Sequence, residues 1–403
     1  MKKKILIFST ACLPMIGGAE IAIKEITDRL GGDFEFDLIC PRINKNLSVR
    51  EQIGSVDIWR VGSGRWGRYD KFLFPWRGFN LAKEMYPKKK YDLVWAIMAS
   101  FGGLAALFFK EQFSGVPYVL NLQEGDTPQH IISRAKWLGP YYRRMFMRAD
   151  FITAISGYLK EYAIKNGAVC PIKIVPNGVD IDKFSSVNRQ SSSQFSREEF
   201  RKKLGISEGE KVIITVSRLV EKNGVGDLIE AVKQLIINDK QSAIRLLIAG
   251  SGELEKSLKS KVRNFCPSGN REQDKKLQDK ILFLGEIPPD EVPKYLAISD
   301  IFVRPSLAEG LGNVFLEALA VGVPIIGTPV GGIPDFLKEG ETGLFCGIHD
   351  PASIAVKINQ ILADGNLRQK LISNGKKLVA EKYDWTIIAP EMGKVFKQLI
   401  TTD

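Results

Sequence analysis

Two carboxylates in the C-terminal half of the chain lie on either side of a glycine-rich segment. Glu309 comes just before this segment, and Glu317 is the only charged residue between Gly310 and Pro334. A short helix is expected over about 313–321, and it is apolar on every side, so we expect it to be interior. An ionised carboxylate in such a place is costly unless donors hydrogen-bond to it. The pattern therefore indicates that Glu317 serves a ligand; a pairing with a nearby Arg or with backbone is the alternative.

The glycine-rich segment itself, formed by Gly310, Leu311, Gly312 and Asn313, is typical of a phosphate site. The backbone N–H groups of such a loop and the N-terminus of the following helix together attract an anion. Carboxylates on both sides suit a ligand that carries sugar hydroxyls at both ends and phosphate between them. The segment and its two flanking carboxylates therefore predict a site for a nucleotide-sugar.

Two further motifs favour a phosphate-containing ligand. Gly17 and Gly18 open an amphipathic helix after the first expected strand, where paired glycines let the backbone approach a phosphate; a plain tight turn explains them equally well. This pair does not match the dinucleotide motif Gly-x-Gly-x-x-Gly. Arg218 and Lys222 follow the expected strand 211–217, where two cations can clamp a diphosphate, unless both are simply solvated at the surface.

The elements that must position these residues form an α/β pattern. Short apolar runs alternate with helix-like stretches, which is typical of parallel sheets. The expected strands are 4–9, 36–41, 57–61, 92–98, 118–123 and 150–156 in the first half, and 211–217, 245–250, 281–285, 301–305, 323–327 and 343–346 in the second. Two doubly wound, Rossmann-like parallel-sheet domains that face each other across a cleft are the economical arrangement. Ligands in such sheets lie beyond the carboxyl ends of the strands, where all the motifs above fall.

Composition predicts where the two domains divide. A polar stretch without periodicity, residues 186–204, is expected to link a first domain over 1–185 to a second over 205–385. The five cysteines are far apart, and two histidines make a zinc site unlikely, so no metal is expected. The N-terminus lacks the long apolar core of a signal peptide and no transmembrane segment is evident, so we expect a cytoplasmic protein.

Charge is distributed unevenly along the 403 residues, which carry a formal net charge of +11. Residues 1–185 contain 27 Lys and Arg against 18 Asp and Glu, whereas residues 186–403 contain 30 against 28. The excess in the first half indicates an anionic partner there. Nucleic acid, anionic lipid and an acidic acceptor are the candidates.

Several motifs together carry a family resemblance over nearly the whole chain. They are Gly17-Gly18, Asn177-Gly178-Val179-Asp180, Ser217-Arg218-Leu219, Pro305-Ser306, the Glu309 and Glu317 pair with its glycine loop, and Pro329-Val-Gly-Gly-Ile-Pro-Asp335. In these motifs the chain resembles the family-4 retaining glycosyltransferases of the GT-B fold. The resemblance implies transfer of a sugar from a UDP- or GDP-linked donor, with retained anomeric configuration and without cofactor or essential metal. The second domain would bind the donor, and the first a glycan or lipid-linked acceptor. A C-terminal helix at about 386–403 would pack back onto the first domain.

The same resemblance implies a role for each residue of the donor site. Glu317 would hydrogen-bond the ribose, Glu309 would contact the transferred sugar as a catalytic residue, and Arg218 with a nearby Lys would hold the diphosphate. In the family this Lys commonly lies five residues after the Arg. That position is Asn223 here, and Lys222 precedes it.

One departure from the family concerns the acceptor side. Many relatives carry a His after the fifth strand of the acceptor domain, whereas residues 121–126 of this chain read Asn-Leu-Gln-Glu-Gly-Asp. Glu124 and Asp126 are the candidates for a catalytic role in place of that His. His130 is a third candidate, although a lone His there is more often a packing or capping residue.

Two other functions share some of these features. A nucleotide-sugar epimerase has the same architecture, but it needs acid–base carboxylates and His in its cleft, and this chain is poor in His. A nucleic-acid-binding protein would use the basic first half, with the aromatic and basic run from Arg65 to Arg77 stacking on bases. That run suits an anionic membrane surface better, since Trp and Tyr lie at headgroup depth and cations bind anionic lipid. We therefore expect cell-surface polysaccharide or glycolipid synthesis, peripheral membrane contact and no nucleic acid.

Overall fold

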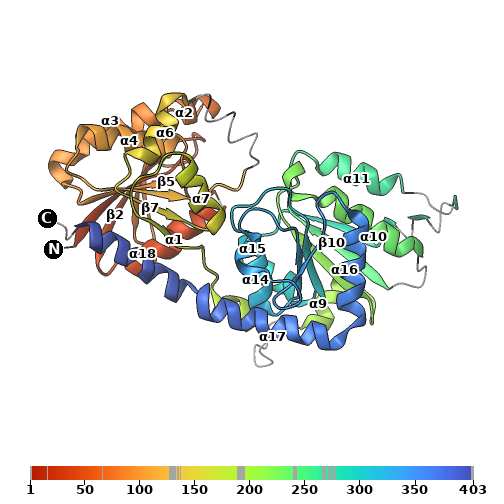
Figure 1. Cartoon of the computed structure of the whole chain (residues 1–403). Coiled ribbons are helices and arrows are strands. Elements are labelled where there is room, and N and C mark those ends of the chain that lie inside the picture. The colour runs from red at the N-terminus through yellow and green to blue at the C-terminus, as the bar shows by residue number, and fades with distance from the viewer. Residues whose placement is uncertain are drawn as a thin grey trace. The chain divides into compact units, whose positions relative to one another are not determined.

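The computed structural model describes residues 2–15, 17–65, 67–126, 133, 136, 138–187, 196–238, 243–265, 269–270, 274–275 and 278–400. The chain forms two compact units, one of Met1–Gly178 with Trp385–Asp403 and the other of Val179–Asp384 (Figure 1). Each unit contains one mainly parallel sheet between helices, so the predicted α/β class with two doubly wound domains is confirmed. Among the described helices, none is both long and apolar enough to cross a membrane.

The sheet of the first unit has eight strands in the order β3-β4-β2-β1-β5-β6-β7-β8. The strands are β1 (Lys3–Phe8), β2 (Phe34–Pro41), β3 (Arg50–Ile53), β4 (Val56–Val61), β5 (Leu93–Ile97), β6 (Tyr118–Leu122), β7 (Phe151–Ala154) and β8 (Ile172–Ile174). All six strands predicted for the first half are present. The strands β3 and β8 were not predicted, because both are short, contain charged residues and lie at the two edges of the sheet, where few apolar residues are needed.

Helices cover both faces of this first sheet (Figure 1). They are α1 (Gly18–Leu30), α2 (Arg68–Phe72), α3 (Phe74–Lys89), α4 (Phe101–Gln112), α6 (Pro140–Met147), α7 (Gly157–Lys165) and α18 (Trp385–Ile400). The C-terminal helix α18 packs against α1 and the sheet, where Phe396 lies 5.7 Å from Phe34 and 5.3 Å from Trp95 between ring centroids. The last residues of the chain thus complete the core of the first unit, together with the strands at its beginning.

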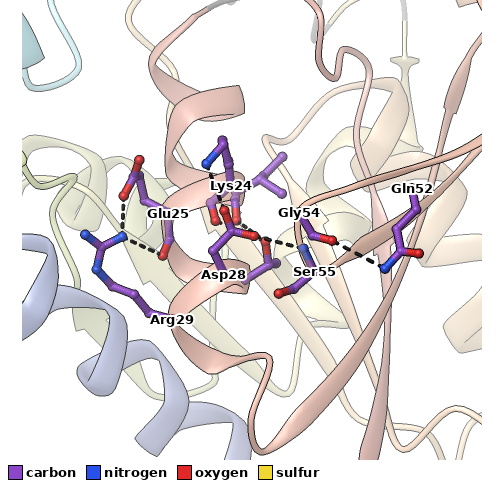
Figure 2. Close-up of polar contacts among 9 residues, drawn as sticks. Lys24, Glu25, Asp28, Arg29, Gln52, Gly54 and Ser55 are labelled. Carbon is purple, nitrogen blue, oxygen red and sulfur yellow. Dashed lines mark hydrogen bonds and ion pairs between the residues drawn. The ribbon is translucent and has the colours of Figure 1, made fainter.

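The hairpin of β3 and β4 is fastened to α1 at its turn (Figure 2). The Asp28 carboxylate accepts hydrogen bonds from the Ser55 backbone N–H at 2.9 Å and from Lys24 Nζ at 2.8 Å. Gly54 in the turn has a φ of +57°, and a Cβ there would lie 2.2 Å from the Asp28 carboxylate. Glycine is therefore favoured at this position, since a side chain would strain the turn and displace the Asp28 carboxylate.

The sheet of the second unit is fully parallel, in the order β11-β10-β9-β12-β13-β14. Its strands are β9 (Lys211–Val216), β10 (Ile244–Ala249), β11 (Ile281–Gly285), β12 (Ile301–Arg304), β13 (Ile325–Gly327) and β14 (Leu344–Phe345), which are the six predicted for the second half. Its helices are α8 (Ile181–Ser186), α9 (Arg197–Lys203), η1 (Glu221–Asn223), α10 (Val225–Asn238), α11 (Glu255–Arg263), α13 (Val292–Ala297), α14 (Asn313–Val321), α15 (Ile333–Phe336), α16 (Pro351–Ala363) and α17 (Gly365–Lys382). The helices α10 and α16 pack together on one face of the sheet, and α14 lies on the other (Figure 1).

Helices also occupy the segments on either side of the predicted domain boundary. The units divide between Gly178 and Val179, so α8 belongs to the second unit, whereas the sequence places residues up to 185 in the first domain. Within the segment expected to be a linker, α9 begins after Ser196, whose hydroxyl accepts the Glu199 N–H at 3.2 Å. Ser-x-x-Glu is a capping-box sequence, which is the local signal for this helix. Residues 188–195 of the expected linker lie outside the described residues.

Candidate active site

The predicted donor residues of the second unit meet where the strand order reverses. The strands β9 and β12 are neighbours in the sheet, and their connections leave in opposite directions, so the loops that follow them flank a topological switch point. Ligands of doubly wound sheets bind at such a point, beyond the carboxyl ends of the strands. Arg218 and Lys222 come from the loop after β9, and Glu309 from the loop after β12.

Short backbone contacts fix these loops against one another. The Leu307 N–H donates to the Lys222 carbonyl oxygen at 2.7 Å. Gly224, with a φ of +65°, comes so close to the loop after β12 that a Cβ would lie 1.9 Å from the Pro305 carbonyl oxygen. The Thr328 hydroxyl, after β13, donates to the Ser306 carbonyl. The three loops therefore form one rigid platform, which is what a preorganised site requires.

Glu309 is held by a buried cation that sequence reasoning missed. The Nη2 of Arg304, the last residue of β12, forms an ion pair with Glu309 Oε2, while Arg304 Nε donates to Ser306 Oγ at 3.1 Å. The Gly310 N–H donates to Glu309 Oε1 at 3.1 Å. Burial lowers the pKa of the Arg304 guanidinium to about 10, so Arg304 stays charged at neutral pH. A cation at the end of the apolar strand Ile-Phe-Val-Arg was the available signal for this partner.

The backbone of Glu309 is fixed as firmly as its side chain. Its carbonyl oxygen accepts the Gly332 N–H at 3.2 Å. Gly331 has a φ of +54°, and a Cβ there would lie 1.7 Å from that same carbonyl oxygen. The Val-Gly-Gly-Ile-Pro motif after β13 therefore serves to clamp the loop that carries Glu309, because only glycine permits so close an approach.

Glu317 lies in the second turn of α14, at the predicted place in the predicted helix. Its side chain is half-buried, whereas Phe315, Leu316 and the residues from Ala318 to Val321 are buried. Within the described part of the chain, its carboxylate makes neither a hydrogen bond nor an ion pair. Burial raises its pKa from 4.5 to about 7, and the charges of Lys183 and Arg304 oppose that rise. Arg304 forms its ion pair with Glu309, and its charge also acts on Glu317.

The predicted phosphate loop is compact and leads directly into α14. Gly310, Leu311 and Gly312 are buried, and Asn313 is half-buried. Gly312, with a φ of +94°, occupies the N-cap position of α14 and provides no side chain to cap the first N–H groups. A helix N-terminus that no side chain caps is suited to bind an anion, because its dipole is positive there.

Arg218 and Lys222 differ in their surroundings. Arg218 is exposed, Lys222 is half-buried, and the charge of Arg218 acts on Arg304 by lowering its pKa further. Asn223 is 5% exposed, and its side-chain amide donates to the Arg218 carbonyl oxygen at 2.7 Å. Asn223 therefore braces the loop internally, which leaves Lys222 as the candidate cation beside Arg218.

A third cation near Glu317 comes from α8, whose role the sequence did not indicate. Helix α8 packs on α14, and the Lys183 charge lowers the pKa of Glu317. Lys183 Nζ also forms an ion pair with Asp290 Oδ1 at 2.6 Å, and Asp290 is almost fully exposed. In sum, Arg218, Arg304 and Lys183 act electrostatically on the same small region as the two carboxylates.

The acceptor-side candidates belong to the first unit, after β6. Glu124 is 2% exposed, and its Oε1 accepts the Ala99 N–H at 2.5 Å. Asp126 is half-buried, and His130 lies outside the described residues. Glu124 therefore connects the end of β6 to the loop after β5. This contact stabilises the fold locally, and the predicted catalytic role would be additional to it.

A chain of buried amides lies beside Glu124. Asn177 donates to Gln123 at 3.0 Å, Gln123 to Asn121 at 2.8 Å, and Asn121 to Thr153 Oγ1 at 2.9 Å. The Asn-Gly-Val-Asp motif that contributed to the resemblance thus begins with a residue that ties the loop after β8 to β6 and β7. Asn177 therefore holds this loop in place against the sheet.

The remaining donor candidates, Gly17 and Gly18, begin α1 after β1. Gly17 is the N-cap residue, has no side chain with which to cap the helix, and is followed by the first helical residue, Gly18. Both glycines lie at the start of the helix that follows β1, where the sequence places them. Among the described residues, no group of three or more His, Cys, Asp or Glu could hold a metal ion.

Family models match both halves of the chain. The model of glycosyl transferases group 1 matches residues 196–378, and that of glycosyltransferase family 4 matches residues 16–183. A relative from Bacillus anthracis, N-acetyl-alpha-D-glucosaminyl L-malate synthase, is 30% identical over 100% of this chain and 99% of its own length. The chain belongs to the family-4, group 1 glycosyltransferases. Alpha-monoglucosyldiacylglycerol synthase of Streptococcus pneumoniae is 25% identical, over 87% of this chain and 76% of its own.

Solved structures show that the glycosyltransferase adopts the GT-B fold predicted for it. Sucrose-phosphate synthase of Thermosynechococcus elongatus superposes with a TM-score of 0.83 at 20% identity, over 100% of both chains. The Anabaena protein HepE, in complex with UDP-glucose, superposes with a TM-score of 0.75 at 19% identity, over 98% of this chain and 99% of its own. The family is one of transferases, which favours glycosyl transfer over the epimerase alternative.

Proposed function

We propose that this glycosyltransferase moves a hexosyl group from a UDP- or GDP-linked donor to an anionic, lipid-linked or glycan acceptor, with retention at the anomeric carbon and without a metal. The observation that carries the donor part is Glu317, a half-buried carboxylate with no partner in the described residues, beside an uncapped helix N-terminus. An unpaired carboxylate of this kind is costly, and ribose hydroxyls would satisfy it.

The charges of the site fit the changes that occur during transfer. Breaking the bond between sugar and phosphate leaves negative charge on the departing diphosphate, so cations there gain strength in the transition state. Arg218 and Lys222 would hold the diphosphate, together with the N-terminus of α14. Glu309, fixed by Arg304, would orient the hydroxyls of the transferred sugar or stabilise positive charge on its ring.

The donor is tested by direct binding to the full-length protein. Isothermal titration with UDP-glucose, UDP-N-acetylglucosamine and GDP-mannose, each with and without EDTA, should give one tight donor whose affinity EDTA does not change. NMR of the product should show the anomeric configuration of that donor. Binding that disappears with EDTA, or an inverted product, would contradict the metal-free retaining mechanism.

A surface of the first unit supports a membrane-associated acceptor. Aromatic rings form a continuous row from α2 across α3 and α4 to α6, with centroid distances of 6.0 Å between Phe72 and Trp76, 6.1 Å between Trp76 and Phe108, and 5.8 Å between Phe108 and Tyr141. Trp76, Tyr141 and the nearby Tyr69 are exposed. Such amphipathic rings at a surface suit the headgroup region of a bilayer.

Exposed cations belong to the same helices as this aromatic row, which we call the aromatic surface, or to the loop before α2. Arg144 lies over the Tyr141 ring at 5.4 Å, and Arg65, Arg143 and Arg77 are exposed. Arg77 also pairs with the buried Asp70 at 2.7 Å, so its replacement would unpair a buried carboxylate and confound a binding test. The positive excess of the first half, together with this surface, supports peripheral contact with anionic lipid.

Vesicle pelleting tests the aromatic surface without involving Arg77. The wild-type protein should pellet with phosphatidylglycerol vesicles and not with phosphatidylcholine vesicles, and 1 M NaCl should weaken this binding. The variants Trp76→Ser with Tyr69→Ser, and Arg65→Glu with Arg143→Glu, should each remain in the supernatant. Equal pelleting of all variants, or tighter binding to RNA than to vesicles, would contradict the proposal.

The Bacillus anthracis relative favours a second class of acceptor. Its name states that it joins N-acetylglucosamine to L-malate, and it matches this chain over its full length. A small hydroxy dicarboxylate would also suit a basic acceptor domain. Transfer assays with L-malate and with phosphatidylinositol or diacylglycerol vesicles separate the two classes, because only one of them should give product.

A further inference from the structure

Two cysteine side chains lie in contact inside the first unit. Cys12 belongs to the loop between β1 and α1, and Cys40 to β2; their side chains are buried. Their Sγ atoms are 2.6 Å apart, only about half an ångström longer than an S–S bond of about 2.05 Å. The two sulfur atoms therefore have the proximity that a disulfide needs.

A buried cation lies beside the two thiols. Arg60 pairs with Cys40 in register across β2 and β4 and is 2% exposed. Its Nη1 donates to the Ser48 carbonyl at 3.1 Å and its Nη2 to the Leu13 carbonyl at 2.6 Å, while its Nε has no partner among the described residues. Its Nη2 also forms an ion pair with Glu51. A guanidinium with a spare donor beside a thiol stabilises the thiolate, which is the reactive form of cysteine.

The two thiols are chemically unequal. The hydrogen bond with Cys40 lowers the pKa of Cys12, burial opposes this, and the charge of Arg60 lowers it further. Burial is the main cause that raises the pKa of Cys40 well above its ordinary value, and the contact with Cys12 adds to it. Cys12 is therefore the nucleophile of the pair, and Cys40 is the resolving thiol, which attacks Cys12 after it is oxidised.

A small cavity gives access to Cys12. It has a volume of about 20 Å³ and is lined by Cys12, Leu13, Glu20, Ile23 and Lys24 among others. This volume accommodates a molecule of about the size of water. Cys12 is therefore the thiol that a small oxidant would approach through this cavity.

We propose that Cys12 and Cys40 form a reversible disulfide when hydrogen peroxide oxidises the protein. The Cys12 thiolate attacks one peroxide oxygen, the O–O bond breaks, and hydroxide leaves to give a sulfenic acid. The Cys40 sulfur then attacks the Cys12 sulfur, the S–S bond forms, and the S–O bond breaks as water leaves with the Cys40 proton. Two thiols are oxidised, and one peroxide is reduced to two waters.

The disulfide would close a covalent loop of residues 12–40, which contains α1 and most of β2. That loop contains Gly17 and Gly18, so oxidation would tether the segment predicted to approach the donor. A crosslink of this span restricts the unfolded chain and stabilises the unit that contains it. The melting temperature of the first unit should therefore rise by roughly 5–10 °C on oxidation and return on reduction.

Peptide mapping of the full-length protein tests the bond directly. After hydrogen peroxide, alkylation and trypsin, peptides 5–24 and 30–42 should appear joined, 2 Da lighter than their sum, and dithiothreitol should separate them. Cys170 and Cys346 are internal controls, since burial raises their pKa to about 11 and about 12, respectively, and they should remain alkylated. Separate alkylated peptides under conditions in which circular dichroism shows a folded chain would overturn the proposal.

Single variants test the order of the two steps. In Cys40→Ser, or in Cys40→Ala if the serine variant does not fold, peroxide should leave a sulfenic acid at Cys12, which dimedone labels when it is present as the chain is unfolded in urea. In Cys12→Ser, Cys40 should stay unlabelled, and neither variant should show the rise in melting temperature. Labelling of Cys40 instead of Cys12 would reverse the assignment. None of these readouts uses a glycosyl donor, so their outcome is independent of the proposed function.

Discussion

The ion pair between Arg304 and Glu309 joins the end of strand β12 to the loop that follows it. The Arg304 side chain is 8% exposed and the Glu309 side chain 14%, so the pair is nearly buried but not fully dry. The carboxylate predicted to contact the transferred sugar is thus aimed by a cation inside the protein. Arg304 should therefore influence where the Glu309 carboxylate lies rather than how tightly the donor binds.

Replacement of Arg304 should therefore affect both stability and turnover. Removing one partner of a fully buried pair costs about 3–5 kcal/mol, and the residual exposure of Glu309 should reduce this to roughly 2–4 kcal/mol in Arg304→Met. Chemical denaturation measures the loss. Arg304→Lys keeps a charge and should recover part of the stability, but not turnover, because Lys lacks the second donor to Ser306. Full turnover in Arg304→Met would show that Glu309 needs no positioning.

Glu317 should make the stability of the second unit depend on pH. Its folded pKa of about 7 lies above the ordinary 4.5, so the folded state binds the proton more tightly than the unfolded state does. The stability from this group is present below pH 4.5 and is lost as pH rises through about 7. Compared with Glu317→Gln, the wild type should lose roughly 1–3 kcal/mol over this range, measured by urea denaturation. The exposed Glu208→Gln is the control and should parallel the wild type.

The same titration should appear in donor binding, with the opposite sign. Ribose hydroxyls need an ionised acceptor, so donor affinity should increase by up to about tenfold between pH 6 and pH 8 in calorimetry. Glu317→Gln should remove this increase. A wild-type affinity that is flat across this interval would show that Glu317 is already ionised or does not touch the donor.

Much of this fold was predictable because parallel strands buried on both faces appear in the sequence as continuous apolar runs. Strand β3, Arg-Glu-Gln-Ile, has no such run because it lies at an edge of its sheet and is largely exposed. The sequence predicts α14 and a ligand role for Glu317, because a single charged residue in an otherwise apolar helix is unusual. Arg304 was missed, although it is the same kind of signal, because a cation at a strand end is also common at surfaces. Its ion pair with Glu309 depends on the conformation of the loop after β12, which the residue types alone do not specify.

Variants of Asn223 and Arg218 should differ in their effects, because Asn223 stabilises the loop after β9 and Arg218 is proposed to bind the diphosphate. Asn223→Ala removes the buried hydrogen bond to the Arg218 carbonyl and should cost about 1–3 kcal/mol of stability. Arg218→Ala removes an exposed cation and should change stability little, while weakening binding of UDP or GDP roughly ten- to a hundredfold. Lys222→Ala should resemble Arg218→Ala. Calorimetry with the free nucleoside diphosphate measures this, and unchanged affinity in both cation variants would move the diphosphate elsewhere.

The acceptor side depends on Glu124 and Asp126 in different ways. Asp126→Asn should lower turnover with donor affinity unchanged, because Asp126 is the more accessible of the two. Glu124→Gln should also lower turnover, and in addition destabilise the first unit, since the amide is a weaker acceptor for the Ala99 N–H. Thermal unfolding and steady-state kinetics distinguish these outcomes. Full activity in both variants would exclude them from the mechanism and direct attention to His130.

The sharpest test compares the two carboxylates of the second unit. Glu317→Ala should chiefly weaken the donor, because the charged hydrogen bonds it loses are worth about 1.5–3 kcal/mol, or roughly ten- to a hundredfold in affinity. Glu309→Gln should leave the donor bound and slow the chemical step, because its carboxylate is held beside the phosphate loop by Arg304 and the Gly310 N–H. Calorimetry gives the affinity of each variant, and single-turnover assays with saturating donor give the rate. If Glu309 governed affinity and Glu317 governed rate, the two roles would have to be exchanged.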